Sequence, residues 1–334
     1  MAERCLITGG AGFIGLHLGR RLAEEGATVT LLDNLSRGRV DDELLAVTGP
    51  DVRLVEHDLT EPIPSDLLPE PFDAVYHLAA VVGVERTAKD PALALRTNIS
   101  TTTHLLDWCD RTRPATVFLS STSEVADGAA QVGLCPYPVP EDTPFVLPRP
   151  QLARASYALS KMVSETMLLQ RQGRFRVRIG RYFNVYGPRM GYAHVIPKFI
   201  QHILDGIDPF PIYGACQSRA FCYVSDAVNG TIALVRCETN APLLANIGDD
   251  RQELSVIELA QRLFTLAGTS PELAILDPPR GSPDRRLPDL TTLRDLTGYE
   301  PRVGLDDGLR RTFAWYSQRW RDAPMSGSRG RSEQ

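Results

Sequence analysis

Two side chains capable of proton transfer stand four residues apart in the chain, at Tyr157 and Lys161. The residues around them predict a helix that begins near Ala155, so both side chains would lie on one helical face. A tyrosine phenol has an ordinary pKa of about 10, which is too high for a base at neutral pH. A neighbouring ammonium group lowers that pKa because it favours the phenolate. The spacing therefore predicts a general base that removes a proton from a substrate hydroxyl.

A second set of polar side chains comes after the strand that we predict at residues 116–120. It begins at Ser121 and continues with Thr122, Ser123 and Glu124. Ligands of open α/β sheets bind at the carboxyl ends of the strands, so this set indicates a catalytic site. We expect Thr122 to hold a substrate hydroxyl, Ser123 to contact the substrate and Glu124 to be a further catalytic candidate.

A glycine-rich turn near the N-terminus is the first element that must position this chemistry. A short apolar strand over residues 5–8 runs into Gly9, Gly12 and Gly15, and a helical pattern continues from there up to Gly26. The three glycines would allow a sharp turn, a close approach of the backbone to phosphates, and packing of the helix on the strand. The N-terminus of that helix would face an anion with its free N–H groups. This arrangement predicts a binding site for a dinucleotide pyrophosphate.

Asp33 indicates which dinucleotide binds. It ends the second predicted strand, residues 28–32, about 20 positions after the glycine turn, where a carboxylate accepts hydrogen bonds from ribose hydroxyls. Arg37 lies close enough to reach a 2′-phosphate, but Asp33 would repel that phosphate, so the sequence favours NAD over NADP. With NAD present, Tyr157 could take a proton while hydride leaves the same substrate carbon.

The other residues that we expect to contact NAD lie in the first helix, at strand ends and in a later helix. Asp58 comes after the third predicted strand, residues 52–56, where a side chain could meet the adenine ring. Small side chains at Ala79 and Ala80 would let the backbone lie close against the cofactor. The complete set comprises Phe13, Ile14, Asn34, Asp58, Leu59, Leu78, Ala79, Ala80 and Asn98.

The order of the predicted elements indicates the fold class. Strands alternate with helices over residues 1–181, which is typical of a Rossmann-type α/β domain with a doubly wound parallel sheet. We expect residues 221–247 to return to this NAD-binding domain. Residues 182–220 and 248–323 would form a smaller substrate-binding domain.

Two further stretches lack a clear pattern of regular structure. Residues 126–152 are rich in Pro, Gly and polar side chains, which predicts an irregular excursion. Residues 324–334 are low in apolar side chains, which predicts a disordered tail.

The composition excludes several classes of partner. The net charge is −5 and the chain has no run of Lys or Arg, so nucleic acid and anionic membranes are not expected partners. No segment reaches the ~18–20 uninterrupted apolar residues that span a bilayer, and none resembles a secretory signal. The six cysteines are scattered without a Cys-x-x-Cys motif, which favours reduced thiols in the cytoplasm over a disulfide framework or a metal site.

Taken together, these motifs resemble the extended short-chain dehydrogenase/reductase family. The resemblance covers residue 3 to about residue 320, and its motifs are specific in combination. It implies nucleotide-diphosphate sugars as substrates and a bound NAD that is reused in each turnover. Tyr157 and Lys161 would also contact this NAD, with Lys161 holding the nicotinamide ribose. It also implies a homodimer, joined through a four-helix bundle that would be built from the helices at residues 91–110 and 155–172.

The resemblance also implies a set of substrate-side residues. Asn184 and Arg189 resemble such residues, and Arg189 could grip a phosphate or a sugar carboxylate with two hydrogen bonds. Arg219 matches a position that usually contacts the nucleotide diphosphate. Arg285 lies in the segment 284–289, which resembles a segment of UDP-glucuronate decarboxylases in which an arginine reaches the diphosphate.

The family shares a first step, oxidation of the hexose at C4 to a 4-keto intermediate, and its members differ in the second step. The ketone is re-reduced from the other face by 4-epimerases, loses carbon dioxide in uronic acid decarboxylases, or loses water in 4,6-dehydratases. We expect a 4-epimerase, in which Tyr157 and Thr122 suffice. A protein that binds NAD for regulation without catalysis is the alternative from another class, and the presence of Tyr157 and Lys161 argues against it.

Glu124 is the residue that keeps the other reactions open. The sequence Thr122-Ser123-Glu124 looks like the one that uronic acid decarboxylases and GDP-mannose dehydratases carry, where the glutamate acts at C5 or assists ring distortion. The dTDP-glucose dehydratases usually have an aspartate where this chain has Ser123, which disfavours that branch. Two departures weaken the likeness to decarboxylases: residues 125–128 read Val-Ala-Asp-Gly in place of the usual Val-Tyr-Gly, and residues 156–161 differ from the usual helix.

Overall fold

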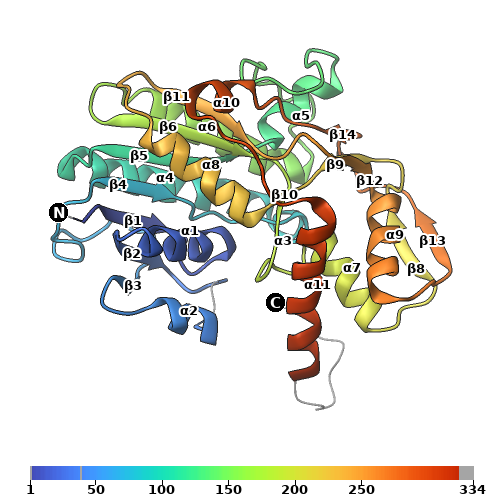
Figure 1. Cartoon of the computed structure of the whole chain (residues 1–334). Helices are drawn as coiled ribbons and strands as arrows, with labels where there is room; N and C mark the ends of the chain where they lie inside the picture. The colour runs from blue at the N-terminus through green and yellow to red at the C-terminus, as the bar shows by residue number, and fades with distance from the viewer. Residues whose placement is uncertain (1, 38–39, 323–334) are drawn as a thin grey trace.

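The computed structural model describes residues 2–37 and 40–322. A large body built around one sheet occupies the left of Figure 1, and a smaller lobe lies at its right. The tail predicted at residues 324–334 lies outside the described residues.

Seven parallel strands form the central sheet, in the order β11-β6-β5-β4-β1-β2-β3. Their bounds are β1 Arg4–Thr8, β2 Thr28–Asp33, β3 Val52–Glu56, β4 Ala74–His77, β5 Thr116–Thr122, β6 Arg176–Tyr182 and β11 Leu243–Ile247. The chain builds outward from β1 to β3 and then crosses back to β4. This reversal puts the switch point of the sheet at the carboxyl ends of β1 and β4, where ligands of such sheets bind. The predicted doubly wound Rossmann sheet is confirmed.

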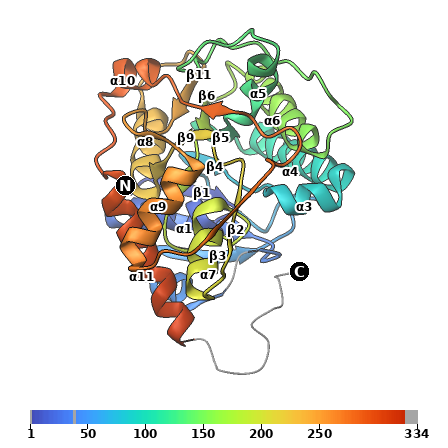
Figure 2. The ribbon, with the colours of Figure 1, turned by 90° about the vertical axis from the view of Figure 1, so that its right-hand side faces the viewer.

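Both faces of the sheet are covered by helices, because alternate residues of its strands are apolar on both sides. Ile7 of β1 packs in one core cluster with Leu18 of the first helix, whereas its neighbour Leu6 packs in the other with Leu105. Figure 2 shows these two helical layers on either side of the sheet. The helices of this body are α1 Phe13–Glu24, α2 Asp42–Val47, α3 Val84–Lys89, α4 Pro91–Thr112, α5 Glu124–Gln131, α6 Ala153–Leu169, α8 Val224–Arg236 and α10 Thr291–Thr297.

Within the described residues, the smaller lobe contains short strands and three helices. Its strands pair as β7 Val185–Tyr186 with β10 Cys222–Tyr223, β8 Phe210–Tyr213 with β13 Leu273–Leu276, and β9 Ser218–Ala220 with both β12 Glu253–Ser255 and β14 Arg285–Arg286. Its helices are α7 Val195–Leu204, α9 Val256–Ala267 and α11 Leu305–Asp322. Figure 1 shows β9, β12 and β14 beyond the carboxyl end of the large sheet.

Three segments add detail to the predicted division of the chain. Residues 222–223 pair with β7 in the smaller lobe, whereas the rest of the segment 221–247 lies in the large body, with α8 packed on β5, β6 and β11, and β11 paired with β6. Helix α10, within the segment 248–323, packs against α8 and β11 of the large body. Helix α5 extends into the residues that we predicted to be irregular. Glycine content contributed to that prediction, but Gly128 is required by packing within the helix, since a Cβ there would lie 1.8 Å from the carbonyl oxygen of Val146.

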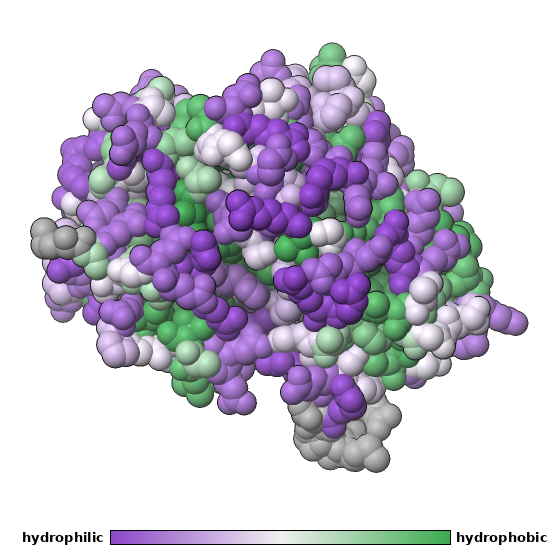
Figure 3. Space-filling model, in the orientation of Figure 1, coloured by the Kyte–Doolittle hydropathy of each residue, from purple (hydrophilic) through white to green (hydrophobic). Residues whose placement is uncertain are grey.

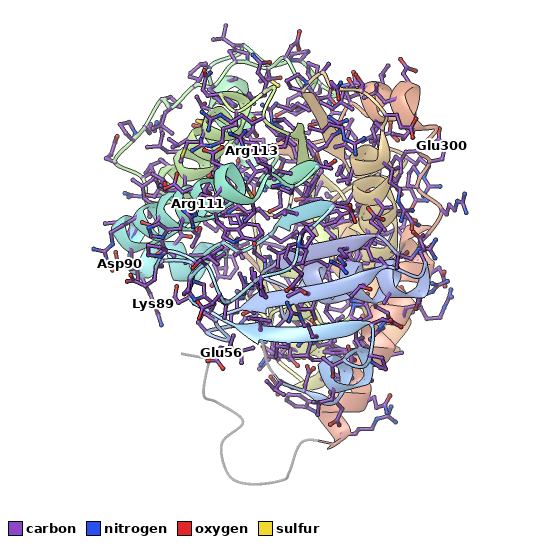
Figure 4. The ribbon with its side chains drawn as sticks, turned by 90° about the vertical axis from the view of Figure 1, so that its left-hand side faces the viewer. Glu56, Lys89, Asp90, Arg111, Arg113 and Glu300 are labelled. Atoms are coloured by element: carbon purple, nitrogen blue, oxygen red, sulfur yellow. The ribbon has the colours of Figure 1, made fainter. Side chains whose placement is uncertain are left out.

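The surface is mixed in character. Figure 3 shows mainly hydrophilic residues, with apolar ones gathered at the right over β8 and β13, where Tyr213 and Ile275 are exposed. On the opposite side, charged residues of both signs project into solvent, including Lys89, Asp90 and Arg111 (Figure 4). In the described part of the chain, no helix combines the length and the apolar character needed to cross a membrane.

Candidate active site

The glycine turn between β1 and α1 has the tight geometry that a pyrophosphate site needs. Gly9 has a φ of 69° and donates its N–H to the Leu32 carbonyl at 2.8 Å. A Cβ on Gly15 would lie 2.2 Å from the carbonyl oxygen of Gly9, so only glycine lets α1 begin this close to the turn. Phe13 and Ile14 form the first turn of α1, half-buried against the core. The cradle fits a dinucleotide, with the helix N-terminus directed at its phosphates.

Asp33 lies beside this turn, as the sequence predicts. Its carboxylate accepts hydrogen bonds from the N–H groups of Ala11 at 3.0 Å and Leu35 at 2.9 Å. Burial raises the pKa of Asp33, and these two hydrogen bonds act against that rise. The predicted adenine-side residues lie at the next strand ends.

Asn34 and Asp58 are joined, since the Asn34 amide donates to the Asp58 carboxylate at 3.1 Å. Thr60 adds a backbone hydrogen bond to Asp58 at 2.8 Å. Leu59, in contrast, has its side chain buried in the core, so only its backbone can face a cofactor.

The chain after β4 continues alongside the glycine turn. Leu78 donates its N–H to the Thr8 carbonyl at 3.1 Å, and Ala79 donates its N–H to the Thr8 hydroxyl at 3.3 Å. Ala80 comes next in the chain, after these contacts with the end of β1. Asn98 of α4 holds the next residue. Its amide oxygen accepts from the Val81 N–H at 2.7 Å, and its amide nitrogen donates to the Val81 carbonyl and to Ser160, both at 3.1 Å. Both amide hydrogens of Asn98 are therefore engaged within the protein.

Tyr157 and Lys161 lie on one face of α6, beside the end of β5. The Tyr157 phenol is hydrogen-bonded to Thr122, as the predicted site requires. The Lys161 ammonium is buried and donates to the Ser120 carbonyl at 2.7 Å. Ser123 lies next to Thr122, with its N–H bonded to the Tyr182 carbonyl at 3.0 Å.

The pKa of Tyr157 departs from the expected direction. Burial and the charge of Glu124 raise it above the ordinary value, while the Thr122 hydrogen bond and Arg286 lower it. Burial also lowers the pKa of Lys161 to about 8, although the nearby Glu165 raises it. The net shift of the Tyr157 pKa is upward because desolvation of the phenol outweighs the favourable charges.

Glu124 lies between two guanidinium groups that sequence reasoning missed. Its carboxylate oxygen is 2.9 Å from Nη2 of Arg154 and 3.4 Å from Nη2 of Arg286. Asp127, one turn further along α5, accepts from Nε of Arg286 at 3.1 Å. Burial raises the pKa of Glu124, but the two arginines outweigh it and hold the pKa below its ordinary value. Glu124 is thus an ionised, largely buried carboxylate close to Tyr157.

The side chains of β14 explain why Arg286 takes the place expected for Arg285. Successive residues of a strand point to opposite sides. Arg285 points to Glu253, at 2.7 Å, and lies over the Tyr137 ring, whereas Arg286 points to Glu124. The sequence shows two adjacent arginines, and their alternate directions along β14 decide which one points to Glu124.

Arg219 lies beside Arg286, because β9 and β14 pair at these two residues. It donates to the carbonyls of Ser218 and Pro283, both at 2.7 Å. Burial and the charge of Arg286 lower the pKa of Arg219 to about 10. These partners carry no negative charge, so a positive charge accumulates at the position predicted to meet a diphosphate.

The other two predicted substrate residues lie near β7. Asn184 has a φ of 40° and donates to the Ala220 carbonyl at 3.1 Å. Arg189 reaches the glycine turn and pairs with Asp41 at 2.9 Å. His194 lies outside the predicted set of site residues; burial lowers its pKa to about 4, with Arg37 lowering it further and Glu124 raising it.

These elements match those of a known family over most of the chain. Residues 5–248 match the model of the NAD dependent epimerase/dehydratase family. The chain belongs to this family. NAD is therefore its cofactor, in agreement with the glycine turn and Asp33, and with solved relatives that contain NAD.

Curated relatives in the family are decarboxylases. The chain is 36% identical to UDP-N-acetyl-alpha-D-glucosaminuronate decarboxylase of Bacillus cytotoxicus, over 95% of this chain and 99% of that protein. It is 35% identical to UDP-glucuronic acid decarboxylase 1 of Xenopus tropicalis, over 94% of this chain and 72% of that protein.

Solved structures of the family include epimerases and dehydratases. UDP-glucuronic acid 4-epimerase from Bacillus cereus, in complex with UDP-glucuronic acid and NAD, superposes with a TM-score of 0.82 at 28% identity, covering 95% of this chain and 99% of that one. The NAD-dependent NDP-hexosamine 5,6-dehydratase TunA has a TM-score of 0.81 at 30% identity, covering 94% and 98%. The family thus includes nucleotide-sugar epimerases, dehydratases and decarboxylases with this fold.

Proposed function

We propose that the protein oxidises C4 of a nucleotide-activated uronic acid and then removes the sugar carboxyl group as carbon dioxide. The observation that carries this proposal is the ionised Glu124, set between Arg154 and Arg286 and close to Tyr157. Oxidation and re-reduction at C4 need only Tyr157, Thr122 and the cofactor. A buried charged cluster beyond that need supports chemistry at the neighbouring carbon, C5. The similarity to two uronate decarboxylases supports the same reaction.

The first half of the reaction is assigned to the residues of β5 and α6. Tyr157 removes the proton of the C4 hydroxyl, and Thr122 holds the oxygen through their shared hydrogen bond. The NAD that the glycine turn and Asp33 would hold would supply a hydride acceptor for C4 and a positive charge near the phenol. Lys161 adds a second positive charge, anchored by the Ser120 carbonyl.

The second half depends on the position of the new ketone. A C4 ketone is β to the carboxylate carried by C5, so the bond between C5 and the carboxyl carbon can break and its electron pair can move toward the ketone oxygen. Tyr157, now protonated, and Thr122 donate hydrogen bonds to that oxygen as it becomes negative. C5 then takes a proton and carbon dioxide leaves. We assign the chemistry at C5 to Glu124, whose charge Arg154 and Arg286 favour.

The nucleotide end of the substrate is assigned to the smaller lobe. Arg219 and Arg286 lie side by side on β9 and β14, and the carbonyl groups that accept from Arg219 are uncharged. A diphosphate would bind there through charge-assisted hydrogen bonds. We propose Arg286 in place of Arg285, because Arg286 points to Glu124 beside Tyr157 whereas Arg285 points to Glu253.

The 4-epimerase that the sequence predicts is our second candidate. It is supported by the Tyr157–Thr122 hydrogen bond, which suffices for it, and by the likeness to a solved UDP-glucuronic acid 4-epimerase. In either case the scattered cysteines support a cytoplasmic location.

The deciding experiment is incubation of the purified protein with UDP-glucuronate, UDP-N-acetylglucosaminuronate and UDP-glucose, with mass spectrometry and NMR as readouts. We expect a uronate to lose the mass of carbon dioxide. A product of unchanged mass with inverted C4 coupling would establish the epimerase instead. Loss of water would establish a dehydratase. The absence of any product would support the non-catalytic alternative.

Glu124→Gln tests the assignment at C5. The variant keeps the shape of the side chain but removes its charge, so we expect release of carbon dioxide to slow by ~10²-fold or more while C4 oxidation continues. The matched control is Glu253→Gln, which breaks a carboxylate–arginine pair that points away from the site, and which should change turnover less than twofold. Wild-type release of carbon dioxide by Glu124→Gln would contradict the assignment.

A further inference from the structure

The loop of residues 187–190, which comes after β7, accepts hydrogen bonds from both parts of the molecule. The Pro188 carbonyl accepts a hydrogen bond from Nε2 of His17 in α1 at 3.1 Å. The Met190 carbonyl accepts one from the Tyr316 hydroxyl of α11. A Cβ on Gly187 would lie 2.7 Å from the Val224 side chain, so the backbone of the loop packs directly against α8. The residue between these two fastened carbonyls, Arg189, therefore has a fixed position.

Arg189 adopts an unusual backbone conformation that directs its side chain to the cofactor turn. Its φ of 68° lies in the left-handed region, which residues other than glycine adopt only where the surroundings hold them. Nη1 donates to the carbonyls of Ala11 at 2.6 Å and Gly12 at 3.1 Å. Nε donates to one carboxylate oxygen of Asp41 at 2.9 Å and Nη2 to the other at 3.2 Å. The side chain is 8% exposed.

These contacts fix peptide groups of the glycine turn. The Ala11 residue is held at both ends, since its N–H donates to Asp33 and its carbonyl accepts from Arg189. In a trans peptide the C=O of one residue and the N–H of the next point in opposite directions. Holding the Gly12 carbonyl toward Arg189 therefore turns the Phe13 N–H away from Arg189. That N–H is the first of α1, one of the free helix N–H groups that bind anions.

Asp41 completes the arrangement from a third element. It caps the N-terminus of α2, where its side chain accepts from the Leu44 N–H at 3.0 Å. Burial raises the pKa of Asp41, but the hydrogen bond and charge of Arg189 outweigh it and lower the pKa, so the pair is ionised. The guanidinium is thus held in one orientation by a carboxylate on one side and by the carbonyls of the turn on the other.

We propose that Arg189 is a positioning residue for the cofactor: it braces the glycine-rich turn from the loop after β7 and thereby sets the affinity for NAD. This differs from the sequence expectation, in which Arg189 grips a phosphate or carboxylate of the substrate. The inference does not depend on which reaction comes after C4 oxidation. It also means that a residue outside the Rossmann-type body helps to form the NAD site.

The test is to measure the equilibrium binding of NAD and of UDP to Arg189→Met by isothermal titration calorimetry. We expect the Kd for NAD to rise about tenfold or more, because several charge-assisted hydrogen bonds are lost. The Kd for UDP should stay within about twofold of the wild-type value. Arg189→Lys keeps the charge without the planar fork, so it should also lose most of the NAD affinity.

The matched control is Arg294→Met. Arg294 likewise pairs with two carboxylates, those of Asp250 and Glu300, but lies on α10 away from the turn. Both Kd values should be unchanged in this variant. Thermal melting of each protein establishes that it is folded.

Two results would overturn the proposal. A Kd for NAD within about twofold of wild type in Arg189→Met would show that the brace is not needed. A weakened UDP Kd with unchanged NAD binding would restore the substrate role. Should Arg189→Met fail to fold, Asp41→Asn decides: we expect NAD binding about threefold weaker or worse, and unchanged binding would refute the brace. Because both equilibria are measured without turnover, a failure of the decarboxylase proposal would leave this test intact.

Discussion

The pKa of the Tyr157 phenol is set by opposing effects, and those that raise it are stronger. Burial and Glu124 raise the pKa of its phenol, whereas Thr122 and Arg286 lower it. The ionised Glu124 that supports the C5 step thus makes the first proton transfer harder. A reaction confined to C4 does not need the charge of Glu124, which raises the pKa of its base. The arrangement of single residues consequently favours a reaction with two distinct steps.

Tyr157→Phe tests the first step. The variant keeps the ring but has no hydroxyl to accept the substrate proton, so turnover should fall by ~10²–10⁴-fold. Binding of NAD, measured by calorimetry, should change by less than about threefold, since the glycine turn is untouched. Product formation is measured by mass spectrometry with the uronate substrate. Turnover at the wild-type rate would remove Tyr157 from the mechanism.

At the scale of elements, the contact between β1, its turn and α1 is the most tightly constrained. Gly15 lets the helix begin against the carbonyl of Gly9, at a distance that leaves no room for a Cβ. Asp33 at the end of β2 and Arg189 of the loop after β7 fix the same turn from two directions. The helix N-terminus therefore has one orientation relative to the sheet, which is what binding of a phosphate requires.

Gly15→Ala is expected to disrupt this contact. The added Cβ would meet the Gly9 carbonyl oxygen at 2.2 Å, so α1 must shift, at a cost of about 1–3 kcal/mol in stability. NAD binding should be lost with it. Gly49→Ala is the control, because nothing lies within 4 Å of a Cβ at that position. Chemical denaturation and NAD titration measure both effects, and equal behaviour of the two variants would contradict the packing argument.

At the scale of the whole molecule, α6 contributes to two surfaces. One face holds Tyr157 and Lys161 in the site. The outer face forms an apolar groove together with the segment after α5; its lining includes Phe145, Leu147, Leu159, Met162, Val163 and Met167. We propose that this groove is covered in a homodimer, the assembly that the family resemblance predicts.

Val163→Asp would place a charge in that groove. We expect the wild-type protein to sediment as a dimer and the variant as a folded monomer, because burying an unpaired carboxylate is costly. Val132→Asp, at an exposed position after α5, should leave the dimer intact. A wild-type monomer in analytical ultracentrifugation would refute the proposal.

The whole molecule should also lose stability in mild acid. Burial lowers the pKa of His77 from 6.5 to about 3, with Lys161 contributing, so His77 stays neutral in the folded chain. The unfolded chain takes up that proton as the pH falls below 6.5, and this favours unfolding. The free energy of unfolding should therefore fall between pH 6.5 and about 3, by up to ~1.4 kcal/mol per pH unit for this histidine.

Urea denaturation at pH 7 and pH 5 measures this dependence. His77→Gln removes the titrating group and should give a shallower decrease than the wild type. His194, with a pKa lowered by burial to about 4, contributes in the same direction and remains in the variant. Equal pH dependence in the two proteins would contradict the role of His77.

Features that depend on neighbours along the chain could be predicted from the amino-acid sequence alone. The glycine spacing, Asp33 after a buried strand, and the pair Tyr157–Lys161 on one helical turn are local patterns. They predicted the parallel sheet and the NAD cofactor, which are confirmed, and a proton acceptor, which stays a prediction. Local patterns did not predict α5, because its Gly128 is needed for the close contact with the Val146 carbonyl, and that contact cannot be read from neighbouring residues.

Contacts between distant residues depend instead on how the elements pack in three dimensions. Arg286 meets Asp127 across 159 positions, and Arg189 meets Ala11 across 178. Which of two adjacent arginines enters the site depends on the position of β14 in its small sheet, and the direction of Arg189 depends on a left-handed backbone held by α1 and α11. Sequence spacing carries no information about such pairings, because side-chain direction at a strand or loop is set by the elements that pack around it.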